Sequence, residues 1–116
     1  MAQLSGTWHL SQVVGAGSGF ATPSAPAAAL LVKPDPGSGL IVLIVECNTA
    51  TASATSTTMV FRQEWVNDLM CSQSPFTATQ ANWFYMRFLT GTVTWQVAGN
   101  VLTITKSGIG SATFNP

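Results

Sequence analysis

The chain has 116 residues, enough for one domain (residues 1–116) around a single hydrophobic core and too few for two. Four basic and four acidic residues give a formal net charge of zero, and charged residues make up only 7% of the chain, against roughly 25% in typical soluble domains. This composition excludes the basic stripe of a nucleic-acid-binding protein and favours a protein partner or self-association, because near-zero charge gives little mutual repulsion.

The sequence predicts no transmembrane segment. Its longest apolar run, Leu40–Val45, is far shorter than the about 20 residues that a membrane-spanning helix needs. The start, Met1–Leu4, lacks the basic region and apolar stretch of a signal peptide. Two locations stay open: periplasmic or extracellular if a signal peptide has been removed, and otherwise virion or cytoplasmic.

The first half of the chain is predicted to form strands separated by glycine- and proline-rich turns. Thr7–Ser11 alternates apolar and polar residues, which is typical of a half-buried strand and places His9 on its polar face. A second strand is expected at Ala28–Val32, before the turn Pro34–Gly37. The β-branched run Leu40–Val45 indicates a central strand that is covered on both faces.

The middle of the chain is harder to assign. Thr49–Ser56 contains only small side chains, so we expect a loop or an exposed edge there. Strand character returns at Thr57–Phe61, whereas Gln63–Pro75 shows no clear periodicity.

One amphipathic helix is predicted after this segment. Thr77 and Gln80 match a capping box at its start, and Gly91 stands where a left-handed residue would end it. The apolar positions follow helical spacing and form one stripe: Ala81, Phe84, Tyr85, Phe88 and Leu89.

A hairpin is predicted at the end of the chain. Val93–Val97 alternates, Gly99-Asn100 is a two-residue turn signal, and Leu102 and Ile104 share a face of the return strand. A short last strand is expected at Ala112–Phe114. The predicted fold class is therefore α+β: a single domain in which a curved, mostly antiparallel sheet of five to seven strands packs around one amphipathic helix.

The sequence offers no convincing catalytic residues, cofactor site or metal site. His9 is the only imidazole, and an exposed strand histidine is the simpler interpretation. Glu46, Glu64 and Asp68 could meet as acid–base carboxylates, but solvated or arginine-paired roles are favoured. Two cysteines and one histidine are too few for a structural zinc site. Because the sequence shows no convincing catalytic group either, we expect a non-enzymatic protein.

Four residues remain candidates for structure or contact. Cys47 and Cys71 are compatible either with a disulfide or with two buried thiols that pack as small apolar side chains. Of the four tryptophans, Trp8 and Trp95 alternate with core residues. Trp65 and Trp83 are therefore the better candidates for an exposed contact surface.

Several short segments follow one another in a characteristic order: Gly6-Thr7-Trp8-His9-Leu10, Cys47-Asn48, Met70-Cys71, a helix with Phe84, Phe88 and Leu89, and the hairpin Val93–Ile104. Through them the chain resembles, over nearly its whole length, the META domain, also called the HslJ-like domain, of small bacterial envelope proteins. The resemblance implies a compact α+β domain, an exported or lipid-anchored location, a link to stress tolerance or virulence, and no established enzymatic activity. It also favours a disulfide between the two cysteines.

The chain departs from the family pattern in three places. The Thr/Ala/Ser stretch after Asn48 replaces a glycine and an aromatic residue, Asn67-Asp68-Leu69 stands where a threonine usually precedes Met70-Cys71, and no lipobox cysteine is found near the start.

Three functions are compatible with these patterns. The first is a non-enzymatic META-like binding or stress-related module of the bacterial envelope. The second is a structural subunit of a virion or surface assembly, in which Trp65, Trp83 or Thr49–Ser56 would be buried against another chain. The weaker third is a lipocalin-like carrier of a small ligand, suggested by the early Gly6-Thr7-Trp8, which would require an enclosed apolar cavity.

Overall fold

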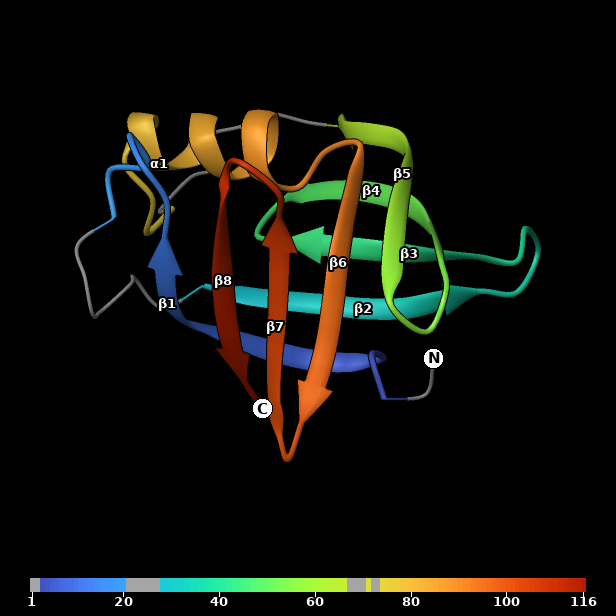
Figure 1. Ribbon diagram of the computed structural model, residues 1–116. Coiled ribbons are helices and arrows are strands. Elements are labelled where there is room, and N and C mark those ends of the chain that lie inside the picture. The colour runs from blue at the N-terminus through green and yellow to red at the C-terminus, as the bar shows by residue number, and fades with distance from the viewer. Residues whose placement is uncertain (1–2, 21–27, 67–70, 72–73) are drawn as a thin grey trace.

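The computed structural model describes residues 3–20, 28–66, 71 and 74–116. In this part of the chain, eight antiparallel strands close into a barrel in sequence order, because the last strand pairs with the first (Figure 1). A short helical segment lies across one end of the barrel (Figure 1, top). The strands are β1 (Gly6–Val14), β2 (Ala29–Asp35), β3 (Leu40–Val45), β4 (Asn48–Ala54), β5 (Thr58–Val66), β6 (Thr92–Ala98), β7 (Val101–Lys106) and β8 (Gly110–Asn115).

The predicted α+β fold class is wrong, because the sheet closes on itself instead of lying open around a helix. The antiparallel pairing is confirmed, as are the strands foreseen in the C-terminal hairpin. The main error concerns Thr49–Ser56, which was expected to be a loop or an edge. Most of that stretch belongs to β4, which pairs with β3 and β5 and so completes the wall.

Small side chains suit β4 because it is one strand of a closed barrel, and large side chains from other strands and from the helical segment fill the interior. Ala50 and Ala52 point inward and are buried, while Thr49, Thr51 and Ser53 alternate with them on the outside. The strand needs no large anchor of its own, since its backbone is hydrogen-bonded to two neighbours.

The outward face of β3 also differs from the prediction of a strand covered on both faces. Ile41, Leu43 and Val45 are buried in the barrel, as the alternation requires. Leu40 and Ile44, on the other face, are only half-buried. The wall of the barrel therefore presents apolar side chains to its surroundings at this strand.

The helical segment begins as predicted and then changes its geometry. Thr77 Oγ1 accepts the backbone N–H of Gln80 at 3.1 Å, and Gln80 Oε1 accepts the N–H of Thr77 at 2.7 Å, which confirms the capping box. One turn of α-helix, α1 (Ala78–Asn82), continues into a π-helix, η1 (Trp83–Phe88). The wider turn ends with the N–H of Leu89 donating to the carbonyl of Phe84, five residues earlier, at 3.0 Å.

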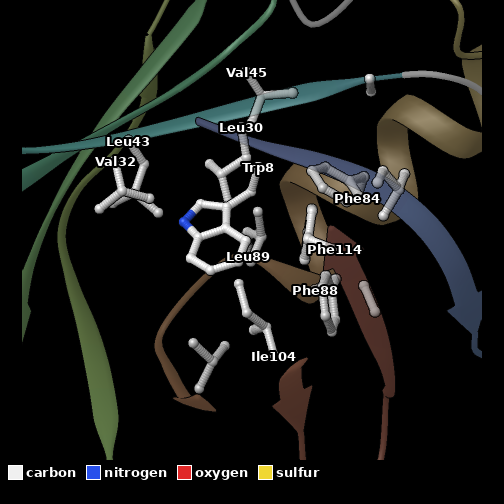
Figure 2. Close-up of a cluster of buried hydrophobic side chains, with 14 of the residues drawn as sticks. Trp8, Leu30, Val32, Leu43, Val45, Phe84, Phe88, Leu89, Ile104 and Phe114 are labelled. Atoms are coloured by element: carbon white, nitrogen blue, oxygen red, sulfur yellow. The ribbon is translucent and has the colours of Figure 1, made fainter. Parts of the chain in front are cut away.

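Gly91 has a φ of 60°, so the predicted left-handed residue after the helix is confirmed. The predicted apolar stripe is also present, because all five of its side chains are buried. The stripe covers the mouth of the barrel from above, and Figure 2 shows the rings of Phe84 and Phe88 among the strand side chains.

The interior of the barrel is filled rather than open. Phe84, Phe88 and Leu89 are each at most 1% exposed, and Figure 2 shows them beside the strand residues that line the barrel. These are the side chains that would occupy the space a lipocalin-like carrier needs for its ligand. The strand contributions labelled in Figure 2 are Trp8, Leu30, Val32, Leu43, Val45, Ile104 and Phe114.

Within the described ranges, no helix has the length and apolar character needed to span a bilayer.

Candidate binding surfaces

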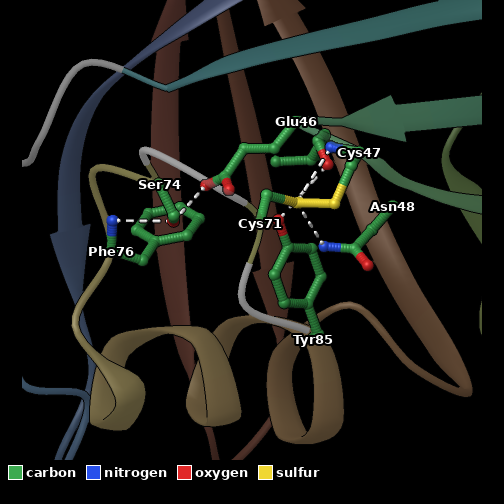
Figure 3. The surroundings of a disulfide bond; sticks show 8 residues. Glu46, Cys47, Asn48, Cys71, Ser74, Phe76 and Tyr85 are labelled. Atoms are coloured by element: carbon green, nitrogen blue, oxygen red, sulfur yellow. Dashed lines mark hydrogen bonds between the residues drawn. A yellow bond between two sulfur atoms is a disulfide. The ribbon is translucent and has the colours of Figure 1, made fainter. Parts of the chain in front are cut away.

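Cys47 and Cys71 form a disulfide, with their Cα atoms 5.8 Å apart. The prediction of a bridge is confirmed. It ties the turn between β3 and β4 to the segment that precedes the helix (Figure 3). Met70, which belongs to the same motif of the family resemblance, lies outside the described residues.

A small polar network surrounds the bridge (Figure 3). Glu46 occupies the turn with a φ of 58°, and its Oε1 accepts a hydrogen bond from Ser74 Oγ at 3.0 Å. Ser74 Oγ in turn accepts the backbone N–H of Phe76 at 3.1 Å, so the turn and the approach to the helix are held together twice, covalently and by hydrogen bonds.

Tyr85 is the titratable group of this network whose pKa the fold shifts most clearly. Its hydroxyl donates to the carbonyl oxygen of Val45 at 3.4 Å from a fully buried position. Burial raises the pKa of the phenol well above its usual value and the charge of Glu46 raises it further, while a hydrogen bond with Asn48 acts in the opposite direction. Tyr85 is therefore a neutral structural hydroxyl at physiological pH.

The residues considered for acid–base chemistry do not form a site in the described structure. His9 is exposed on the outer face of β1, as predicted, and Glu46 belongs to the turn beside the disulfide. Asp68 and the side chain of Glu64 lie outside the description. Among the residues that are described, no three His, Cys, Asp or Glu side chains gather closely enough to hold a metal ion.

Neither candidate tryptophan is a freely exposed contact. Trp65 is half-buried and donates its indole N–H to the carbonyl of Leu89 at 2.9 Å. Trp83 is only 2% exposed and stacks on Phe88, with ring centroids 4.8 Å apart and an interplanar angle of 11°. The sequence could not show this, because the π-helix rotates Trp83 into the core beside the expected stripe.

A cleft of about 320 Å³ lies where the loop after β1 meets the helical segment. No local sequence pattern indicates this cleft, because it combines a loop glycine with side chains from successive turns of the helical segment. Three of its side chains carry polar groups that can reach a ligand, and none is acidic. The lining residues are Gly17, Ala78, Thr79, Asn82, Trp83 and Arg87.

A second candidate surface is on the outside of the barrel. The outward side chains of β6, for comparison, are Thr92, Thr94 and Gln96, all exposed and polar. Around β3 the outward side chains are instead apolar and half-buried. We call this set the apolar wall; it consists of Leu31 on β2, Leu40, Val42 and Ile44 on β3, and Val60 on β5.

Pairing registers join the apolar wall into rows across neighbouring strands. Leu31 is opposite Ile44, which is opposite Thr49 on β4. Small hydroxyl side chains of β4 thus lie between the apolar residues of β3 and those of β5, and Ser53 is opposite Val60. The wall therefore extends over β2–β5, and on its β2 side the charged residues Lys33 and Asp35 are opposite Val42 and Leu40.

Comparison with known proteins finds no match: no family model, no curated protein and no solved structure is significantly similar to this chain.

Proposed function

We propose that the protein is a non-enzymatic interaction module whose contact surface is the apolar wall and whose partner is a second copy of the chain. The observation that carries this proposal is the concentration of outward apolar side chains on β2, β3 and β5, in contrast to the polar outward face of β6. Apolar side chains grouped on one face, within a polar surround, are typical of protein–protein contact sites.

Charge favours a second copy over a charged partner. On β2, Lys33 is opposite Val42 and Asp35 is opposite Leu40, so one cation and one anion adjoin the wall there, and Arg62 lies on β5. Because these two charges are opposite in sign, a twofold arrangement can place Lys33 of one copy near Asp35 of the other and avoid like-charge repulsion. The formal net charge of zero removes long-range repulsion between copies as well.

The size of the surface predicts a weak association. Four strands about 4.8 Å apart and roughly 20 Å long cover an area on the order of 400 Å² per copy. A standard stable interface buries about 800 Å² per partner. We therefore expect a dimer that forms in the micromolar range or above and dissociates on dilution.

The disulfide supports a place of action outside reducing compartments, since such bonds persist mainly in oxidising environments. We combine this with the resemblance to the META or HslJ-like domain and propose a module of the bacterial envelope. One departure from the family pattern, the Thr/Ala/Ser stretch after Asn48, forms β4 and so falls on the proposed contact surface rather than on the C-terminal hairpin.

The test is the mass of the protein in solution, measured by light scattering after size exclusion over a range of concentrations. We expect a concentration-dependent shift from monomer to dimer. Ile44→Lys should abolish the shift by placing a charge in the centre of the wall, whereas Gln96→Lys, the matched charge on β6, should leave it unchanged. Ile44→Thr, which keeps a β-branched side chain, should weaken dimerisation and guards against a folding defect in the lysine variant.

Each outcome separates the candidate functions. A monomer at every concentration would overturn the proposed self-association. Equal effects of Ile44→Lys and Gln96→Lys would overturn the assignment of the surface. Discrete species larger than a dimer would favour the structural subunit of a virion or surface assembly, because such an assembly needs a second contact surface.

A further inference from the structure

The cleft beside the helical segment is distinct from the apolar wall, and its polar side chains are not used by the fold. The guanidinium of Arg87, the carboxamide of Asn82 and the hydroxyl of Thr79 make no hydrogen bond or ion pair with any other described residue. Gln80 on the same segment is by contrast fully engaged, because its amide also donates to the carbonyl of Gly19 at 3.0 Å.

Packing contacts with the rest of the fold hold the residues that line the cleft in position. Trp83 is fixed between the ring of Phe88 and the backbone of Gly15, which lies in contact with its six-membered ring. The loop that carries Gly17 is anchored by Phe20, whose ring is 5.6 Å from that of Phe76 and 6.1 Å from that of Trp83. A ligand would therefore meet a largely preformed surface, which lowers the entropy cost of binding.

The charge in the cleft is positive, and no described side chain pairs with it. Arg87 is exposed, no acidic side chain lines the cleft, and none of the described carboxylates pairs with Arg87. Lys106, a cation elsewhere in the fold, is by contrast held by the carbonyl and hydroxyl oxygens of Thr90, at 2.8 and 2.7 Å. An arginine fork with free donors is suited to a planar carboxylate, which it can bind with two parallel hydrogen bonds.

The indole of Trp83 is the second unusual feature of the cleft. The N–H groups of Trp8, Trp65 and Trp95 donate to the carbonyls of Leu4, Leu89 and Thr55 at 2.9, 2.9 and 3.0 Å. The N–H of Trp83 is equally buried but has no acceptor among the described residues. A buried donor normally has a partner, so the environment of this ring is incomplete within the described part of the chain.

We propose that the cleft binds a small organic carboxylate with an apolar body. The carboxylate lies on the guanidinium of Arg87, with the amide of Asn82 as an additional donor, and the apolar body lies against the small part of the Trp83 ring that lines the cleft. A volume of about 320 Å³ is at the lower end of ligand pockets, which limits the ligand to roughly the size of one ring with one acid group. This inference does not depend on self-association through the apolar wall.

The test uses benzoate as the probe and benzamide as its neutral counterpart, with the four indole N–H signals of the protein followed by NMR. We expect benzoate to shift the Trp83 signal saturably, with a dissociation constant on the order of 1 mM, and benzamide to bind at least about tenfold more weakly. Arg87→Gln should weaken benzoate binding by about tenfold or more. Arg62→Gln, an exposed arginine on β5, is the matched control and should leave binding unchanged.

Three results would overturn the proposal. The first is the absence of a saturable shift at Trp83, and the second is equal binding of benzoate and benzamide. The third is an equal loss of benzoate binding in Arg87→Gln and Arg62→Gln, which would indicate a general effect of charge. Because Arg87 is exposed and unpaired among the described residues, its replacement leaves the fold intact and the comparison informative.

Discussion

The backbone of Gly15, just after β1, lies against the six-membered ring of Trp83 in the helical segment. A Cβ atom built on Gly15 would overlap Cζ2 of that ring. A Cβ on Gly110 of β8 would lie 3.0 Å from the same atom and 3.0 Å from the Cα atom of Gly15, so the two glycines are neighbours beside the ring. Two glycines thus allow the seam between β1 and β8 to approach the helix closely, and they hold Trp83 in position over the mouth of the barrel.

Replacing Gly15 by alanine should lower the free energy of unfolding by about 1–3 kcal/mol, because the added methyl group overpacks the Trp83 ring. The measurement is urea denaturation followed by tryptophan fluorescence. Gly37→Ala is the control, since the nearest atom to its added Cβ is Asp35 Oδ1 at 3.8 Å. Equal stabilities of the two variants would contradict the close approach of Gly15 to Trp83.

Removing the disulfide should lower the free energy of unfolding by about 3–4 kcal/mol, mainly because the unfolded chain regains the freedom of the loop between the cysteines. The variant is Cys47→Ser with Cys71→Ser, compared with the wild-type protein by chemical denaturation with and without a reductant. Reductant should destabilise the wild type to the level of the double variant and leave the double variant unaffected. A reductant effect of equal size in both proteins would show that it does not act through this bond.

Loss of the helix cap should be measurable and specific. Thr77→Ala removes the acceptor for the N–H of Gln80 and should cost about 1 kcal/mol of stability. Thr77→Ser keeps a hydroxyl at the same position and should retain most of that stability. A serine variant that melts as low as the alanine variant would show that the methyl group of Thr77, and not the capping hydrogen bond, supplies the stabilisation.

Tyr85 is the only tyrosine, so the ultraviolet absorbance of tyrosinate reports on this residue alone. Its raised pKa means that the folded protein keeps the phenol proton at pH values where the unfolded chain, with an ordinary pKa of 10.0, releases it. Stability is therefore insensitive to this group below pH 10.0 and falls above it, by up to about 1.4 kcal/mol per pH unit. In an alkaline titration, tyrosinate should appear together with unfolding.

Tyr85→Phe is the control for the alkaline titration. It should remove this part of the pH dependence, while Lys106, whose pKa is lowered by burial, contributes equally to both proteins. Ionisation of Tyr85 near its ordinary pKa, while the protein remains folded, would contradict the buried position of the phenol.

The parts of the structure that the sequence predicted correctly depend on neighbouring residues. The capping box of Thr77 and Gln80 is a three-residue pattern, and the hairpin around Gly99-Asn100 requires only alternation and a turn. The exposure of His9 follows from the same alternation on β1. The pairing of Cys47 with Cys71 was left open by spacing and was favoured only through the family resemblance.

The parts that the sequence missed depend on distant residues. The stretch Thr49–Ser56 has no large side chain, so its own composition indicates a loop. Most of it nevertheless forms β4, because its backbone pairs with β3 on one side and β5 on the other. The burial of Trp83 follows from the π-helix and from the glycines that face it, which are far away in the sequence. The cleft and the apolar wall likewise exist only once loops and strands from separate parts of the chain are neighbours.

The sequence by itself therefore determined most of the strands, the start of the helix and the low charge, because alternation, capping and composition act over a few residues. Only the tertiary structure decided that the sheet closes into a barrel, that the aromatic face of the helix fills its mouth, and that Arg87 and Trp83 share a cleft. The physical reason is that closure is a property of the pairing between the first and the last strand. Hydrogen bonds between β1 and β8, about a hundred residues apart, leave no signature in either segment alone.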